Sequence, residues 1–307
     1  MKIDVSIIIA AFNARDTLSR ALDSVLAQSK TTWEVIVVDD CSLDDTYAIA
    51  TRYAKQNPRI RILQTPSNSG PSAARNLALN NAKGEYFTVL DADDWFAINR
   101  VEILIRAAHN QHADVVVDSY FLVKPATTTC YAAKHTDLCQ ASQTMSIDTP
   151  FFIAKGLGAT KPLVKIALLN EYSLCFDESI KGGEDLLLYA QVLMKSTRCL
   201  FINQPTYFRT EAPYSLSRTD RVSFLNAVLN VFATLNKTIH QSASDSTELQ
   251  DAIRYREMVT QDALAAEKWK QWFITNGKAP FPSLASIVGL VRHLRYRKTR
   301  YSINVLS

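Results

Sequence analysis

The sequence predicts an α/β fold: a doubly wound, mostly parallel sheet with a C-terminal helical extension. Two observations predict it. The first 120 residues alternate between short apolar runs and runs of helical periodicity, and from residue 220 onward only helical patterns occur. Strict alternation is typical of βαβ crossovers, which make neighbouring strands parallel and cover both faces of the sheet with helices.

The elements can be placed in order along the chain. Short apolar or β-branched runs predict strands at 5–12, 34–38, 59–63, 85–90 and 113–120. Apolar residues at three- and four-residue steps predict helices at 15–29, 46–56, 71–83 and 99–111. From 121 the chain is polar and rich in turns. Helices are expected again near 161–170, at 184–195 and beyond 220, with breaks at 241–246 and 276–282.

The bulk composition is that of an ordinary soluble protein. Of the 307 residues, 47% are hydrophobic and 21% are charged, which suits one large or two modest domains. The five cysteines form no C-x-x-C pair, so free thiols in a reducing compartment are expected. We interpret the apolar start of the chain as a strand and not as a signal peptide, and no run is long enough to span a bilayer. A cytoplasmic location follows as an expectation.

Polar clusters follow four of the predicted strands directly. They are Phe12-Asn13, Asp39-Asp40, the stretch 68–70 and the stretch 91–94. Ligands of an open parallel sheet bind beyond the carboxyl ends of the strands, so the four clusters are expected to form one site. Phe12 suits stacking on a base, against the alternative of a core aromatic. Asp39 and Asp40 suit a base N–H or a ribose hydroxyl, against the alternative of capping the next helix.

The stretch VLDADDW ends a buried strand with three carboxylates. On extended backbone Asp91 and Asp93 would leave the same face, where two negative charges favour a cation between them. The alternative is that an Asp caps the helix 99–111. Asp91 and Asp93 supply hard oxygen ligands for Mg²⁺ or Mn²⁺, which bridge diphosphate oxygens. Arg75, near the start of its helix, suits the diphosphate itself, against the alternative of a surface ion pair.

Four motifs in this order resemble glycosyltransferase family 2, of the GT-A fold class. They are SIIIAAFNARDTLSRALDSVLAQ, EVIVVDDCSLDDT, NSGPSAARNLAL and GEYFTVLDADDW. The resemblance continues more loosely through GGEDLLLYAQ (182–191) and YFRTEAPYSLSR (207–218), and it includes bacterial exopolysaccharide enzymes of the succinoglycan type. Ala10 stands where the family usually has Pro, a departure expected to alter only the local backbone stiffness.

The resemblance implies roles for single residues. The nucleotide sugar is expected to contact Ala10, Phe12, Asn13, Asp39, Asp40, Asn68, Arg75, Asp91 and Ala92. Mn²⁺ or Mg²⁺ is expected at Asp91 and Asp93. Asp185 is expected to be the catalytic base, with Glu184 beside it; the alternative is a pair of acids that favours the helix dipole. The resemblance divides the chain into a nucleotide-sugar half (1–120), an acceptor and base half (121–219) and a helical region (220–307).

The implied reaction is a metal-dependent transfer of one sugar with inversion. The donor would be a nucleotide-diphosphate sugar, UDP-glucose or similar, and the acceptor a lipid-linked glycan in exopolysaccharide or surface polysaccharide biosynthesis. The Q-x-x-R-W motif of processive synthases is absent. A sugar-nucleotide-binding protein without turnover is the main alternative, and the intact D-x-D and Glu-Asp motifs count against it. A nucleotidyltransferase would want a Gly-rich, Lys/Arg-bearing N-terminal loop.

The net charge of +4 hides a basic tail. No Asp or Glu follows Glu267, whereas Lys and Arg continue to Arg300. The segment 281–301 joins an apolar helical stripe to five cationic side chains, which predicts attachment to an anionic membrane surface. The alternative is that the stripe docks on the catalytic domain. Nucleic acid is not expected as a partner, because the rest of the chain is acidic.

Overall fold

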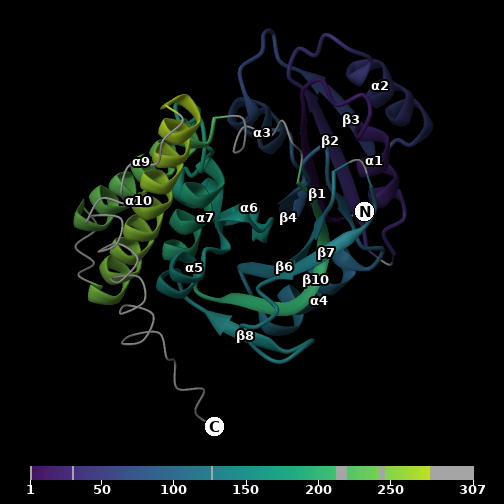
Figure 1. Ribbon diagram of the computed structural model, residues 1–307. Helices are drawn as coiled ribbons and strands as arrows, with labels where there is room; N and C mark the ends of the chain where they lie inside the picture. Colours follow the sequence, from purple (N-terminus) through teal and green to yellow (C-terminus); the bar gives the residue numbers. More distant parts are fainter. Residues whose placement is uncertain (1, 30, 126, 212–219, 242–245, 277–307) are drawn as a thin grey trace.

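The computed structural model describes residues 2–29, 31–125, 127–211, 220–241 and 246–276 (Figure 1). Its first part repeats strand and helix in the predicted order: β1 (Ile3–Ala11), α1 (Leu18–Leu26), β2 (Trp33–Asp39), α2 (Thr46–Gln56), β3 (Ile60–Gln64), α3 (Pro71–Leu79) and β4 (Gly84–Val89). Then follow β5 (Trp95–Phe96), α4 (Arg100–Gln111) and β6 (Val115–Val123). The five predicted strands therefore correspond to β1, β2, β3, β4 and β6.

The second part of the chain is less regular and ends in two long helices. Its elements are β7 (Cys130–Lys134), β8 (Thr144–Ile147), α5 (Thr149–Lys155), the 3₁₀ helix η1 (Leu157–Ala159), β9 (Leu163–Lys165), α6 (Ile166–Tyr172), α7 (Glu184–Lys195) and β10 (Cys199–Thr210). The helices α9 (Arg221–Gln241) and α10 (Thr247–Asn276) lie side by side and pack on α7 and α5 (Figure 1). The helices expected beyond 220 are thus present within the described residues.

The described strands form one mixed sheet. The order of its main path is β3-β2-β1-β4-β9-β6-β10-β5, with β7 added at β6 and β8 at β10. Strands β3, β2, β1 and β4 are parallel neighbours, and so are β6 and β10. Because the first four strands run in one direction, their carboxyl ends share one edge of the sheet, as the sequence predicts.

The helix predicted near 161–170 is wrong in its first part. Leu163–Lys165 is the strand β9, which pairs antiparallel with both β4 and β6, and helix α6 begins only at Ile166. These three residues close the gap between the two parallel parts of the sheet. Pairing on both sides satisfies their backbone groups, which a short buried helix end would leave without partners.

Helices cover both faces of the sheet, as expected of a doubly wound fold. Successive residues of β1 enter different cores, because side chains alternate along a strand: Ile7 and Ile9 face α1, α2 and α4, whereas Ile8 faces α3 and the later helices. None of the helices in the described part of the chain is long and apolar enough to cross a membrane. The segment 281–301 lies outside the described residues, so its attachment to a membrane stays a prediction.

Candidate active site

The aspartates of VLDADDW form a tight turn at the carboxyl end of β4. The backbone N–H of Asp94 donates to the carbonyl oxygen of Asp91 over 3.0 Å. The prediction that Asp91 and Asp93 leave one face of an extended strand is therefore wrong, because the chain turns here to enter β5. Neither is an Asp the cap of α4, since Asn99 occupies that position.

Asp94 fastens this turn to β10. Its buried carboxylate accepts from the Tyr207 hydroxyl and from the backbone N–H of Thr210, both over 2.7 Å. The Tyr207 hydroxyl in turn accepts from the backbone N–H of Asp91 at 3.2 Å. Burial raises the pKa of Asp94, and the charges of Asp93 and Asp91 add to this effect. The third aspartate is thus an anchor that leaves the other two side chains available to the site.

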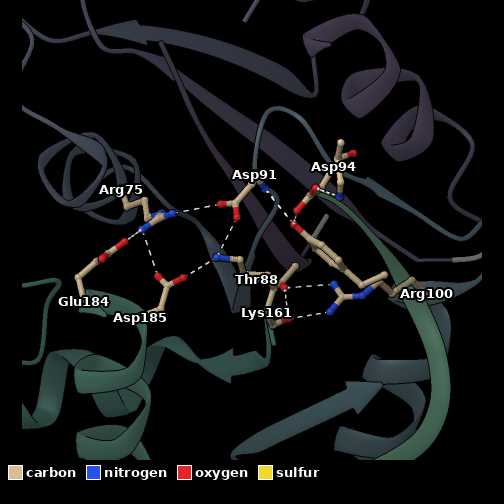
Figure 2. A network of polar contacts seen from close by, with 10 residues as sticks. Arg75, Thr88, Asp91, Asp94, Arg100, Lys161, Glu184 and Asp185 are labelled. Carbon is tan, nitrogen blue, oxygen red and sulfur yellow. Dashed lines mark hydrogen bonds and ion pairs between the residues drawn. The ribbon is translucent and has the colours of Figure 1, made fainter. Parts of the chain in front are cut away.

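Two cations hold the carboxylate of Asp91. Arg75 Nη2 lies 3.1 Å from its Oδ1, and Lys161 Nζ lies 3.0 Å from its Oδ2 (Figure 2). Burial opposes ionisation of this carboxyl group, but the charges of Lys161 and Arg75 outweigh it and hold the pKa of Asp91 well below its usual range. Asp91 is therefore ionised and fixed in place.

The same cations hold the two acids at the start of α7. Arg75 Nη1 lies 2.8 Å from Glu184 Oε1 and 3.1 Å from Asp185 Oδ1, and Lys161 Nζ lies 2.5 Å from Asp185 Oδ2 (Figure 2). Helix α7 can begin at this point because Gly183, with a φ of 84°, takes a left-handed backbone that few other residues adopt. The D-x-D turn and the Glu-Asp pair, far apart in the sequence, thus meet at one place.

Arg75 differs from its predicted surroundings. It lies on α3 as expected, but it is buried and its guanidinium points at three carboxylates, so it is not a surface ion pair. Its contact with a diphosphate stays a prediction. Arg209 on β10 also lies near the turn, and it has fewer polar contacts than Arg75. Its guanidinium lies 5.9 Å from the ring centre of Tyr120, and no ion pair joins it to a carboxylate of the described residues.

Asp93 has the chemistry expected of a metal ligand. Its carboxylate is half-buried, and burial followed by the charge of Asp91 raises its pKa, so its own charge is poorly compensated. The described residues contain no cluster of three or more His, Cys, Asp or Glu side chains arranged around a metal ion. One carboxylate together with substrate phosphates and water is nevertheless a usual setting for Mg²⁺, so Asp93 fits a divalent ion that arrives with a diphosphate.

The remaining predicted residues lie along the same edge of the sheet. Asn13 joins the first two strand ends, because its side chain accepts from the backbone N–H of Leu43 at 2.9 Å. Asp40 joins the next two: it accepts from the backbone N–H groups of Ser69 at 2.9 Å and Gly70 at 2.7 Å, and it does not cap α2. Both side chains thus hold the loops at this edge of the sheet in place by hydrogen bonds.

The residues predicted to contact the nucleotide differ in exposure. Phe12 is 46% exposed, so it is not a core aromatic, and Asn68 is also exposed. Ala10 is half-buried, and Ala92 is buried. Asp39 is fully buried; one of its oxygens accepts from Gln64 and Ser42, whereas the other, Oδ1, has no hydrogen-bond partner among the described residues. An exposed ring and an unsatisfied carboxylate oxygen thus lie beyond neighbouring strands.

The sequence assigns no role to several residues of the site. Lys161 precedes a short apolar run, and Arg100 is one of two arginines on a predicted helix. Tyr207 and Arg209 belong to the loosely resembling stretch 207–218, in a strand interrupted by Pro205. The antiparallel insertion of β9 brings Lys161 to the D-x-D turn, and the pairing of β10 with β6 brings Tyr207 and Arg209 there.

Comparison with known proteins identifies relatives of this chain. Residues 6–163 match the model of "Glycosyl transferase family 2". The succinoglycan biosynthesis protein ExoO of Rhizobium meliloti is 32% identical over 234 residues, which cover 74% of this chain and 66% of ExoO. The chain thus spans slightly less than two thirds of the length of this relative.

Two solved structures share the fold. Residues 1–349 of S. aureus TarS in complex with UDP-GlcNAc match with a TM-score of 0.63 at 19% identity, over 98% of this chain and 93% of that one. The mannosyltransferase PcManGT from Pyrobaculum calidifontis, in complex with GDP-Man and Mn²⁺, matches with a TM-score of 0.58 at 17% identity, over 97% of this chain and 82% of that one. At such identities these likenesses concern the fold alone, and they confirm the expected fold class.

Proposed function

The chain belongs to glycosyl transferase family 2 and has the GT-A fold, and on this premise we propose that it moves one sugar, with inversion, from a nucleotide-diphosphate sugar to a hydroxyl of a glycan. The observation that carries the proposal is the meeting of the D-x-D turn with the Glu-Asp pair: Arg75 and Lys161 each contact both Asp91 and Asp185. A donor-site carboxylate and a candidate base therefore lie close together, bridged by the same two cations.

The strand ends and the relatives support a proposal for the donor. The exposed ring of Phe12 suits stacking on a base, and the unpartnered Oδ1 of Asp39 suits a base N–H or a ribose hydroxyl. Asn13 and Asp40 hold the loops around this position, with Asn68 at their rim. Because the TarS structure contains UDP-GlcNAc, a UDP-linked sugar, UDP-glucose or similar, is the proposed donor.

The kind of relative supports a proposal for the acceptor. ExoO is a succinoglycan biosynthesis protein, which supports a glycan acceptor in exopolysaccharide or surface polysaccharide assembly. We propose a lipid-linked oligosaccharide, which the basic segment 281–301 would meet at an anionic membrane surface. No nucleic acid is proposed as a partner.

Negative charge grows on the diphosphate as the sugar leaves. Arg209 has no carboxylate partner among the described residues and lies near the D-x-D turn, so it is the side chain best suited to this charge. Asp93, supported by Asp91, would hold Mn²⁺ or Mg²⁺, as the solved mannosyltransferase with Mn²⁺ supports. When bound there, the divalent ion supplies positive charge next to the leaving diphosphate.

A hydroxyl group is a weak nucleophile until a base takes its proton. Asp185 is the proposed base, because its carboxylate lies at the N-terminal end of α7, across from the D-x-D turn and beside Lys161 and Arg75. Of the two cations Arg75 and Lys161, Glu184 contacts only Arg75, so we assign it the role of holding that arginine. A single base opposite the leaving group gives one displacement, and hence inversion.

A panel of UDP- and GDP-linked sugars, assayed for release of the nucleoside diphosphate with Mn²⁺ present, tests the proposal. We expect one donor, linked to UDP, to be turned over by the wild-type chain and not by Asp185→Asn. Tight binding of a sugar nucleotide by calorimetry without any release, in the presence of glycan acceptors, would favour the binding protein without turnover instead.

A further inference from the structure

Lys161 is a buried cation that the motifs of the sequence do not include. Its side chain is 6% exposed, yet its Nζ lies 3.0 Å from Asp91 Oδ2 and 2.5 Å from Asp185 Oδ2 (Figure 2). Burying an ammonium group is costly unless carboxylates surround it, and here the two carboxylates come from opposite sides of the proposed reaction. Lys161 therefore lies directly between the donor-site acid and the base.

The backbone of Lys161 is fixed by a separate set of contacts. Its carbonyl oxygen accepts from Arg100 Nη2 at 2.7 Å and from Thr88 Oγ1 at 3.0 Å (Figure 2). The guanidinium of Arg100 is itself held by both oxygens of Asp118, at 3.1 and 2.8 Å. All of these side chains are buried. The core of the sheet thus fixes the backbone from which the lysine side chain reaches the two carboxylates.

Arg75 cannot replace Lys161 at this position. Arg75 contacts Oδ1 of both Asp91 and Asp185, whereas Lys161 contacts Oδ2 of both. Without the lysine, the two Oδ2 atoms would face each other with no cation between them, and like charges at such a distance repel. The separation of the two carboxylates therefore depends on the ammonium group.

We propose that Lys161 is a positioning residue for sugar transfer, which holds Asp185 at a fixed distance from Asp91 so that the acceptor hydroxyl approaches the donor sugar in line. The proposal rests on the proposed function. Among the described residues Lys161 contacts neither Phe12 nor Asp39, the groups proposed for the base and the ribose, and Asp91 keeps its ion pair with Arg75 when the lysine is removed. Its loss should affect the alignment of the reacting groups and leave donor binding in place.

The steady-state kinetics of Lys161→Met and Lys161→Arg test this role, with Lys165→Met as the control. Lys165 ends β9, the strand that Lys161 precedes, and its Nζ lies 3.7 Å from Asp114 Oδ1, away from the proposed site. We expect kcat of Lys161→Met to fall about 100-fold with a donor KM near that of the wild type, because small misplacements of reacting groups have effects of this size. Lys161→Arg should recover part of the loss, and Lys165→Met should be close to the wild type.

Two kinetic results would overturn the proposal: a raised donor KM with kcat unchanged, or equal kinetics for Lys161→Met and Lys165→Met. A thermal unfolding comparison tests the underlying contact without any turnover. Adding Asp185→Asn to Lys161→Met should raise Tm, because it removes one of two repelling charges, whereas the same change in the wild type should lower Tm. Equal shifts in both backgrounds would contradict the contact. A wild-type chain that turns over no donor would refute the proposed function and leave this second comparison decisive.

Discussion

Arg75 and Asp185, 110 residues apart in the sequence, form an ion pair of 3.1 Å between α3 and α7. The pair joins the helix that follows the third strand to the helix that carries the candidate base. Since the Arg75 guanidinium also contacts Asp91 and Glu184, this side chain connects the acids of both motifs. Its removal should consequently affect folding as well as catalysis.

Arg75→Met should lower the free energy of unfolding by about 3–5 kcal/mol, because it leaves buried carboxylates without a partner. Urea unfolding, followed by circular dichroism, measures the change. Arg52→Met, at an exposed position of α2, is the matched control and should be near neutral. Equal stability of the two variants would show that the Arg75 ion pairs contribute little to the fold.

Asp185→Asn should leave the dissociation constant of UDP nearly unchanged while transfer falls by about 10²–10⁴-fold or more, because a general base acts only on the acceptor. Calorimetry with UDP and the donor assay give the two values. Glu184→Gln is the neighbouring comparison. An active Asp185→Asn beside an inactive Glu184→Gln would move the base to Glu184, and two active variants would make the motif structural.

The first half of the fold and the edge that carries the site could be predicted from the sequence. Strands β1, β2 and β4 are largely buried and contain short apolar or β-branched runs, so their ends locate Phe12, Asp39 and Asp91 on one edge. The start of α7 at Glu184 was predictable as well, since a Gly pair precedes it.

The contacts between these residues could not be predicted. The turn at Asp91–Asp94 depends on Tyr207 and Thr210, more than 110 residues away, and on a strand with two register shifts around Pro205. Lys161 reaches the site only because β9, three residues long, inserts between β4 and β6. Local periodicity contains no information about such insertions, and strands this short are easily assigned to a neighbouring helix.

Asp93→Ala should abolish transfer and weaken the binding of the nucleotide-diphosphate sugar, because the Asp93 carboxylate has no ion pair among the described residues and burial raises its pKa. EDTA should abolish the activity of the wild type, and added Mn²⁺ or Mg²⁺ should restore it. Asp16→Ala, at an exposed position before α1, controls for the loss of a carboxylate. Full activity in EDTA would contradict the role of a metal ion at this site.

His135 should make the stability of the fold depend on pH. Burial lowers its pKa to about 4 from an ordinary 6.5; Asp137 opposes this, and Lys134 and Arg256 add to it. The fold thus favours the neutral imidazole, and the resulting stability, present above pH 6.5, is lost as the pH falls toward 4. Tm should fall less over this range in His135→Asn than in the wild type. Asn tolerates the φ of 65° at this position.

His112→Asn is the control for that substitution, because His112 also has a left-handed backbone but is exposed. It should retain the pH dependence of the wild type. Parallel Tm curves for His135→Asn and the wild type between pH 6.5 and 4 would show that His135 is not held neutral in the fold.

A single displacement between the D-x-D turn and Asp185 inverts the anomeric carbon, so the anomeric configuration of the released sugar reports on it. Proton NMR during turnover of the active nucleotide-diphosphate sugar, recorded before mutarotation, identifies the first anomer formed. We expect the anomer opposite to that of the donor, with no release by Asp185→Asn. Initial formation of the same anomer as in the donor, or undiminished release by Asp185→Asn, would contradict it.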